Sequence, residues 1–331
     1  MTVINILKAP QGSAEAAEPT AGGRGAAAVG LPIPVGRRVE LPGRGTTFVR
    51  EVDGPPGAPA LVLIHGWIAS AGINWYQLFE PASRHFRVIA PDLRGHGRGI
   101  RSRRRFRLAD CADDIAVLLD ELEVPSAIMV GYSMGGPVAQ LLWKRHRSKV
   151  DGLVLCATSH RFVPGMRERL VFTTLMATAA GTSRAGQLFT VLPRSVVRQF
   201  APVTAKGRPT SLQRWAAAEI RRHDLRMVLE AGHAIGHYDA SRWIGNIDVP
   251  TAVVVTTKDR ALTPAEQARL AFAIPHATIH RIEDGHVACT SPAFAAPVLA
   301  ACTEVAVKAY PGWHPNRRVD DVAVGVGTSE R

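Results

Sequence analysis

The sequence is poor in aromatic residues and in cysteine, and it contains no long apolar run. Aromatic residues make up 6% of its 331 positions, and the four cysteines are Cys111, Cys156, Cys289 and Cys302. Because these cysteines have neither the spacing of zinc or redox pairs nor the density of a disulfide framework, we expect reduced thiols in a cytoplasmic protein. No stretch approaches the roughly 18 consecutive apolar residues of a membrane-spanning helix. No basic segment followed by an apolar run marks a secretory signal at the N-terminus.

Acidic residues are also scarce. The chain has 28 of them against 40 lysines and arginines, which gives a formal net charge of +12. The densest basic segment runs from Arg94 to Arg107 and contains no acidic residue. Such charge attracts nucleic acids and anionic surfaces, but no helix-turn-helix, RNP or zinc-finger pattern accompanies it. We therefore expect no specific nucleic-acid partner and at most weak attraction to anionic surfaces or substrates.

Apolar residues are abundant, at 46% of the chain, and charged residues make up 21%. This balance is typical of a globular protein with a sizeable core, and the length suits one large α/β domain that carries an insertion. Residues 11–30 are rich in alanine and glycine without an apolar period. Such a segment buries too little to offset its ordering entropy, so residues 1–36 are predicted to be a disordered extension. Residues 311–331 are predicted to be a flexible tail.

The central part of the chain alternates between strand and helix patterns. A hairpin is predicted in RRVELPGRGTTFVREV, around Pro42–Gly45, and the first helix is expected around Asn74–Arg84. Further buried strands are predicted in ALVLIHG, FRVIAPD, SAIMVGYS, GLVLCATS, PTAVVVTTKD and ATIHRIED. Repeated alternation of this kind predicts a mostly parallel sheet that is covered by helices on both faces.

The alternation stops after the sixth strand and resumes about 85 residues later. The interrupted stretch has a helical pattern, so we predict a helical cap over residues 159–247. The α/β core is predicted over residues 37–158 and 248–310. The cap is expected to wall an apolar pocket with Phe162, Leu170, Phe172, Leu175, Met176, Leu188 and Phe189.

A G-x-S-x-G motif, GYSMG, places Ser133 between an apolar strand and an amphipathic helix. This is the pattern of a nucleophile elbow, in which the serine occupies a strained turn and side chains two residues away on either side would clash. The turn lifts Oγ above the sheet and directs a helix N-terminus at the reacting oxygen. Ser133 is therefore the predicted nucleophile.

A serine nucleophile needs a base, and the base needs an acid that orients it. In folds with this elbow, both groups follow later strands, with the acid before the histidine. Asp259 follows the strand TAVVVTTK, and His286 follows the strand ATIHRIE. No carboxylate follows the strand GLVLCA closely, so Asp259 and His286 are the predicted acid and base.

The oxyanion hole is predicted from the backbone N–H groups of Met134 and Trp67. Met134 follows the nucleophile, and Trp67 follows His65 and Gly66 at the end of an early strand. We expect His65 to hold this loop rather than to react. His233 and His237 lie on a predicted cap helix, where they either face substrate or only pack.

Five loops resemble those of the α/β-hydrolase superfamily, in its serine-nucleophile esterase, lactonase and cofactor-free haloperoxidase branch. They contain HGW at 65–67, PDLRGHGRG at 91–99, GYSMGG at 131–136, KD at 258–259 and DGHV at 284–287. The resemblance covers roughly residues 37–310. It implies a doubly wound sheet with a helical cap after the sixth strand, the catalytic residues Ser133, Asp259 and His286, and an oxyanion hole at Trp67 and Met134. It also implies no cofactor and no metal.

The resemblance narrows the activity without fixing the substrate. Dehalogenases and epoxide hydrolases of this fold carry aspartate at the place of Ser133, and lipases of the HGGG type carry more glycines than Gly66 alone. The implied reaction is hydrolysis of a small-molecule ester or lactone, or of another acyl substrate, through an acyl-enzyme. Three alternatives remain: an acyltransferase, a cofactor-free perhydrolase or haloperoxidase, and a non-catalytic ligand-binding protein.

Overall fold

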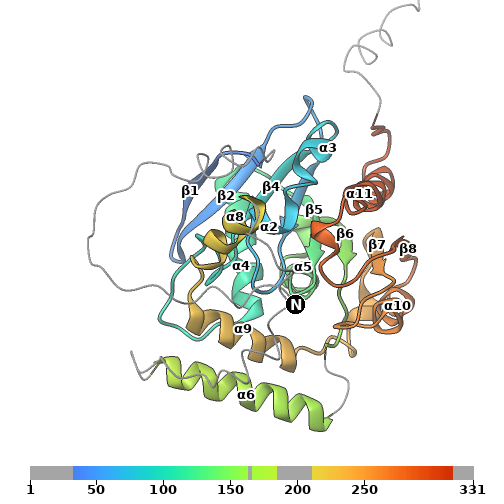
Figure 1. Cartoon of the computed structure of the whole chain (residues 1–331). Coiled ribbons are helices and arrows are strands. Elements are labelled where there is room, and N and C mark those ends of the chain that lie inside the picture. The colour runs from blue at the N-terminus through green and yellow to red at the C-terminus, as the bar shows by residue number, and fades with distance from the viewer. Residues whose placement is uncertain (1–32, 163–165, 185–210, 316–331) are drawn as a thin grey trace, which may run out of the picture.

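The computed structural model describes residues 33–162, 166–184 and 211–315 of the chain (Figure 1). Within these residues, eight strands form one sheet in the order β1-β2-β4-β3-β5-β6-β7-β8. The strands are β1 Gly36–Leu41, β2 Gly45–Val52, β3 Ala60–Ile64, β4 Arg87–Pro91, β5 Ala127–Tyr132, β6 Val150–Cys156, β7 Thr251–Thr256 and β8 Thr278–Ile282. β1 and β2 form the predicted antiparallel hairpin, β2 is antiparallel to β4, and all other pairs are parallel.

Helices cover both faces of the sheet (Figure 1). One face packs against α4 Leu108–Glu121, α5 Gly135–Arg145 and α10 Pro264–Ala273. The other packs against α2 Ala71–Trp75, α3 Phe79–Ser83 and α11 Ala295–Ala309. The central strands are buried on both faces, which explains their near-continuous apolar runs. The predicted doubly wound, mostly parallel α/β sheet is thus confirmed.

The region predicted as one helix, Asn74–Arg84, contains two short helices instead. α2 begins after Ser70, whose side chain accepts a hydrogen bond from Ile73 N, and α3 contains Pro81. Proline has no N–H to donate and its ring collides with the preceding turn, so a continuous helix through this position is disfavoured. The prediction of a single helix was wrong for this reason.

Among the described residues, three α-helices lie between β6 and β7, where the sequence predicts the cap. They are α6 Met166–Arg184, α8 Ser211–Ile220 and α9 Leu225–His237. α6 packs along α9, and α9 lies nearer the sheet (Figure 1). The limits of the predicted cap, residues 159–247, stay a prediction. Leu188 and Phe189, two of its expected pocket residues, lie outside the described residues.

The predicted terminal extensions lie mostly outside the described residues. At the N-terminal side, β1 already begins at Gly36, and Ile33 packs against the core. At the C-terminal side, the Trp313 ring packs against Phe86 with ring centroids 5.1 Å apart. Trp313, in the segment predicted to be a flexible tail, thus packs against the core, while the limits of both predicted extensions stay predictions. None of the described helices is long and apolar enough to cross a membrane.

Candidate active site

The site lies where the winding direction of the sheet reverses. From β3 the chain continues to β4 on one side, and it later returns to β5 on the other side. In open α/β folds, the usual ligand site lies at such a reversal, beyond the carboxyl ends of the strands. Trp67 follows β3 and Ser133 follows β5, so adjacent strands bring their loops together.

Ser133 has the strained backbone that its motif predicts. Its φ is +51°, in the left-handed region that only glycine adopts without cost. A Cβ on Gly131 would lie 2.4 Å from the Gly135 oxygen, and a Cβ on Gly135 would lie 2.1 Å from the Ile64 oxygen. Glycine is therefore required at both positions, because neighbouring backbone atoms lie too close to leave room for a side chain.

Hydrogen bonds stabilise this turn from the neighbouring strand. Ser133 N donates to the Cys156 oxygen at 2.9 Å, and the Thr158 hydroxyl donates to the Ser133 oxygen at 2.8 Å. Thr158 also occupies the space that a side chain at Gly136 would need. Cys156, the last residue of β6, and Thr158 thus support the serine turn, a role that sequence analysis did not predict.

Ser133, His286 and Asp259 form a continuous hydrogen-bonded chain. Ser133 Oγ lies 2.9 Å from His286 Nε2, and His286 Nδ1 lies 2.7 Å from Asp259 Oδ2. The three residues are up to 153 positions apart in the chain, and the sheet brings them together at one edge. The structure therefore places the three predicted residues in contact, in the order in which a nucleophile, a base and an acid would act.

Asp259 is held as a buried carboxylate by several donors. Its Oδ1 accepts from Ala261 N at 2.8 Å and from Leu262 N at 2.9 Å, and its Oδ2 accepts from the Thr256 hydroxyl at 2.9 Å. Burial by itself would raise the pKa of Asp259, but the hydrogen bonds from His286, Leu262 and Thr256 outweigh it, so the pKa lies below its ordinary value. The carboxyl group is therefore ionised at neutral pH.

Gln267 and Tyr132 are two site residues that sequence analysis missed. Gln267, fully buried on α10, donates to Asp259 Oδ2 at 3.2 Å and to the Thr256 hydroxyl at 2.8 Å. The Tyr132 hydroxyl donates to the His286 backbone oxygen at 2.7 Å. Tyr132 is the residue before Ser133, so its place in the motif was a possible signal. A single buried glutamine on a later helix gave no comparable signal.

The predicted oxyanion donors lie on the two loops next to Ser133. Met134 is the residue before α5, and a Cβ on Gly66, next to Trp67, would lie 3.3 Å from Ser133 Cβ. Gly66 N donates to the buried Asn74 side chain at 2.9 Å. Among the described residues, neither Met134 N nor Trp67 N donates a hydrogen bond. Both N–H groups are therefore available to an anionic oxygen near Ser133.

His65 holds the loop after β3, as the sequence predicts. Its Nε2 accepts from Leu93 N at 2.9 Å, so Nδ1 carries the proton and donates to the Gly66 oxygen at 2.8 Å. Complete burial lowers the pKa of His65 and keeps the ring neutral. The His65 ring thus links the loop after β3 to the loop after β4.

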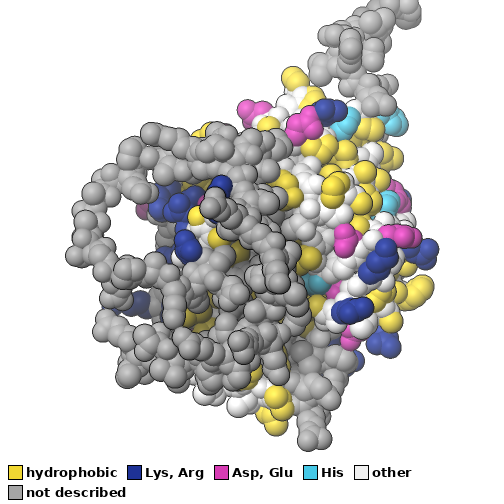
Figure 2. Space-filling model, viewed as in Figure 1, with side chains coloured by type: hydrophobic (Ala, Val, Ile, Leu, Met, Phe, Trp, Pro, Cys, Tyr) yellow, Lys and Arg dark blue, Asp and Glu magenta, His cyan; other side chains and the backbone are white. Residues whose placement is uncertain are grey.

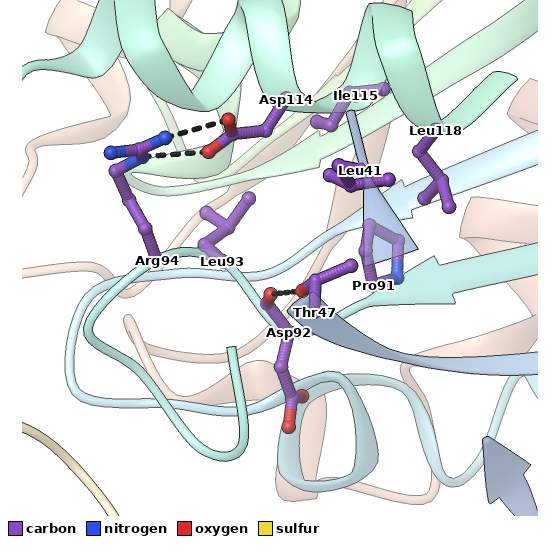
Figure 3. A pocket seen from close by; sticks show the side chains of 9 residues that line it. All are labelled: Leu41, Thr47, Pro91, Asp92, Leu93, Arg94, Asp114, Ile115 and Leu118. Atoms are coloured by element: carbon purple, nitrogen blue, oxygen red, sulfur yellow. Dashed lines mark hydrogen bonds and ion pairs between the residues drawn. The ribbon is translucent and has the colours of Figure 1, made fainter. Parts of the chain in front are cut away.

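The loop after β4 is braced by an ion pair. Arg94 donates to both Asp114 oxygens at 2.6 Å (Figure 3). The small cavity in Figure 3 lies between this pair, Thr47 and Leu118, and its volume is about 10 Å³. That is about the space of one water molecule. No residue of the Ser133 chain lines it, so it is not a substrate pocket.

The helix α6 contacts the loop after β3 through two aromatic residues, Phe172 of α6 and Trp67 of the loop. Their rings meet edge to face with centroids 6.4 Å apart. Leu170 and Leu175 of the expected pocket are instead exposed on the outside of α6, because the other side of this helix packs against α9. His233 Nδ1 lies 3.0 Å from the Thr173 oxygen, so this histidine joins α9 to α6.

The four cysteines are free and buried. Burial raises the pKa of the Cys289 thiol, three residues after His286, to about 12. This thiol is therefore protonated at neutral pH and is a poor nucleophile.

Comparison with known proteins agrees with this architecture. The sequence pattern of the alpha/beta hydrolase fold matches residues 59–291. The chain belongs to the α/β-hydrolase family. It is thus an enzyme of the hydrolase type, and the family predicted from its loops is confirmed.

Individual relatives within the α/β-hydrolase family are distant. The magnesium-chelatase 30 kDa subunit of Rhodobacter capsulatus is 30% identical over 248 residues, which cover 71% of this chain and 82% of that protein. The pimeloyl-[acyl-carrier protein] methyl ester esterase of Vibrio vulnificus is 32% identical over 155 residues, 47% of this chain and 56% of the relative.

Solved α/β-hydrolase structures align over most of the chain. An esterase from Thermogutta terrifontis has a TM-score of 0.66 and 24% identity, and the alignment covers 82% of this chain and 99% of the esterase. The enol-lactonase from Burkholderia xenovorans has a TM-score of 0.60 and 24% identity, with 79% and 96% covered. At this level of identity the alignments support the fold.

Proposed function

We propose that this α/β-hydrolase is a serine hydrolase that cleaves a carboxylic ester or lactone. Ser133 is the nucleophile, His286 the base, Asp259 the acid, and the N–H groups of Trp67 and Met134 form the oxyanion hole. The observation that carries the proposal is the continuous hydrogen-bonded chain from Ser133 Oγ through His286 to Asp259, at 2.9 and 2.7 Å. These distances are within the range required for proton transfer from nucleophile to base.

In the first step, His286 Nε2 removes the Ser133 proton while Oγ attacks the carbonyl carbon of the ester. A C–O bond forms, and the carbonyl electron pair moves to the oxygen, where the Trp67 and Met134 N–H groups stabilise the negative charge. The tetrahedral intermediate then collapses, and the alcohol leaves with the proton from His286. The product is an acyl-enzyme on Ser133.

In the second step, water attacks the acyl carbon while His286 accepts its proton. The second tetrahedral intermediate expels Ser133 Oγ, which takes the proton back from His286. Asp259 keeps the imidazole in the required tautomer and stabilises its cation during both steps. The low pKa of Asp259 supports this role because the carboxylate keeps its charge throughout the cycle.

The substrate is proposed to be a small molecule with a carboxylic ester, lactone or other acyl group. Support comes from two kinds of relative, a methyl ester esterase and a lactonase. The rings of Trp67 and Phe172, which pack edge to face, are proposed to form an apolar wall of the substrate site. A cytoplasmic location for this reaction stays a prediction.

The test is a panel of ester and lactone substrates of increasing chain length, assayed with the wild type and with Ser133→Ala. We expect turnover of at least one substrate, and a loss of kcat on the order of 10⁶-fold in the variant. Circular dichroism should show an unchanged fold. If no substrate is hydrolysed, or if the variant retains wild-type turnover, the proposal is wrong.

A competing acceptor separates hydrolysis from acyl transfer. With added alcohol, thiol or amine, a hydrolase forms mainly the free acid, whereas an acyltransferase forms mainly the new ester, thioester or amide. We expect the free acid as the main product. A dependence of product formation on peroxide would indicate perhydrolysis instead.

A further inference from the structure

An arginine-lined groove lies on the carboxyl edge of the sheet, beside the loop after β4. Its volume is about 500 Å³. This is within the size range of sites for small organic ligands. Lys and Arg side chains gather on this side of the molecule, in the region of β1 and α8 (Figure 2). The residues that line the groove are Arg38, Thr46, Gly97, Arg98, Gly99, Arg101 and Arg222.

Two of the four guanidinium groups are held in fixed positions. Arg98 donates through Nη1 and Nη2 to the two Glu219 oxygens, both at 2.9 Å, and its guanidinium lies 4.9 Å from the centre of the Phe48 ring. Arg101 donates to the backbone oxygens of Gly97, at 2.8 Å, and Arg222. A cation bound to carbonyl oxygens keeps its full charge, because it has no carboxylate partner to neutralise it.

Carboxylates are too few to neutralise the groove. Glu219, which is 3% exposed, is shared by Arg98 at 2.9 Å, Arg222 at 3.5 Å and the buried Arg50 at 3.9 Å. Among the described residues, no carboxylate lies within ion-pair distance of Arg38 or Arg101.

Two other carboxylates lie near the groove, and both accept hydrogen bonds from backbone N–H groups. Asp92 accepts from Ala71 N at 2.8 Å and from Arg98 N at 2.9 Å. Asp224 accepts from Met227 N at 3.1 Å at the start of α9.

The buried Arg50 and Asp92 offset each other, so the four lining guanidinium groups face two carboxylates, Glu219 and Asp224, which leaves about two positive charges uncompensated in the groove. Partial burial lowers the pKa of Arg101, the carboxylates of Asp224 and Asp92 oppose this effect, and the Arg38 guanidinium adds to it. The cations therefore repel one another, and a bound anion would relieve this repulsion.

We propose that the groove binds the phosphate group of a small phosphorylated ligand, at a site separate from Ser133. A phosphate monoester carries nearly two negative charges at neutral pH, which matches the excess charge of the groove. Its oxygens accept paired hydrogen bonds from the planar fork of a guanidinium group. A carboxylate ligand has one charge and leaves half of the excess uncompensated.

The test is calorimetric titration of the full chain carrying Ser133→Ala with inorganic phosphate, glycerol 3-phosphate and acetate, at equal and low ionic strength. We expect saturable binding of both phosphates at one site, and binding of acetate at least about tenfold weaker. Tighter binding of glycerol 3-phosphate would identify an organic phosphate as the ligand, and tighter binding of inorganic phosphate would identify the free ion. Both results support the site.

Two double variants locate the binding. Arg38→Gln with Arg222→Gln removes two lining cations and should weaken phosphate binding at least about tenfold. Arg103→Gln with Arg105→Gln removes the same charge from exposed positions outside the groove, and should change the affinity less than about twofold. In the chain without these arginine substitutions, the affinity for phosphate should fall as the salt concentration rises. Absence of saturable phosphate binding, equal weakening in both double variants, or acetate binding as tight as phosphate binding would overturn the proposal.

Discussion

The Trp67 indole donates a hydrogen bond from Nε1 to the Val228 backbone oxygen at 2.8 Å. This bond joins the loop after β3 to α9, across 161 positions of the chain. Gly232, one turn further along α9, provides the space, because a Cβ there would lie 2.7 Å from the Trp67 ring. The loop that carries a proposed oxyanion donor is thus anchored to a helix of the insertion after β6.

Trp67→Phe should lower ester turnover by affecting kcat more than KM. The phenyl ring retains most of the apolar contact but cannot donate to Val228, so the loop loses its anchor and the backbone N–H of residue 67 is less well positioned. We expect kcat to fall about tenfold and stability to fall by about 1 kcal/mol. Steady-state kinetics and urea unfolding measure the two effects.

Trp143→Phe is the matched control for this prediction. Trp143 Nε1 donates to Asp248 Oδ1 at 3.0 Å, remote from the Ser133 chain. Its loss should reduce stability by a similar amount and leave kcat unchanged. Equal kcat values for both variants would contradict an anchoring role of the Trp67 side chain.

Gln267→Ala should reduce turnover without removing any group of the proposed triad. The variant leaves Asp259 Oδ2 and the Thr256 hydroxyl without their buried amide donor, so the carboxylate is less firmly oriented toward His286. We expect a loss of about tenfold in kcat and a shift of the pH profile, measured with a neutral ester.

The matched control for this loss is Gln140→Ala, which also removes a fully buried glutamine. The Gln140 side chain bonds Ser159 and Tyr238 rather than Asp259. Gln140→Ala should lower the free energy of unfolding but leave the pH profile of turnover unchanged. An unchanged pH profile in Gln267→Ala would show that Gln267 has only a packing role.

Asp259→Asn should be far more damaging than Gln267→Ala. The amide is similar in shape but has no charge, and it does not favour the imidazole tautomer in which Nε2 accepts the Ser133 proton. By analogy with triads of this kind, kcat should fall on the order of 10⁴-fold. If Asp259→Asn is nearly fully active while Glu283→Gln is inactive, the acid has been misidentified.

His223 should make the fold sensitive to mild acid. Burial lowers the pKa of His223 from 6.5 to about 4, and its Nδ1 accepts from Gly97 N at 2.7 Å. Between about pH 6.5 and pH 4, His223 is protonated in the unfolded chain but neutral in the folded state. The free energy of unfolding therefore falls as the pH falls through this range. One such group costs on the order of 2 kcal/mol at about pH 5.

Urea unfolding at about pH 7.5 and pH 5 measures this loss. The drop in unfolding free energy should be smaller in His223→Gln, which keeps a hydrogen-bond acceptor but does not titrate. His314→Gln, at an exposed position, should behave like the wild type. An identical drop in both variants would show that other groups cause the acid sensitivity.

Much of this architecture could be predicted from the sequence because its signals are local. Apolar runs bounded by turns predicted the strands, and the glycines around Ser133 predicted a tight strand-to-helix turn. The order of Ser133, Asp259 and His286 after successive strands predicted their meeting, because parallel strands end at one edge of a sheet. Ser133 and Asp259 each lie within hydrogen-bond distance of His286 at that edge.

Other features were decided only by the tertiary structure. Nothing local distinguishes Gln267, which contacts Asp259 only because α10 packs beside β7, or Trp67, whose partner Val228 lies on a distant helix. The basic segment likewise appeared uniform in sequence, yet Arg94 is neutralised by Asp114, Arg98 shares Glu219 and Arg103 is exposed. Charge is a property of each residue, but its compensation depends on which residues the packed chain brings within a few ångströms, and that depends on contacts between distant segments.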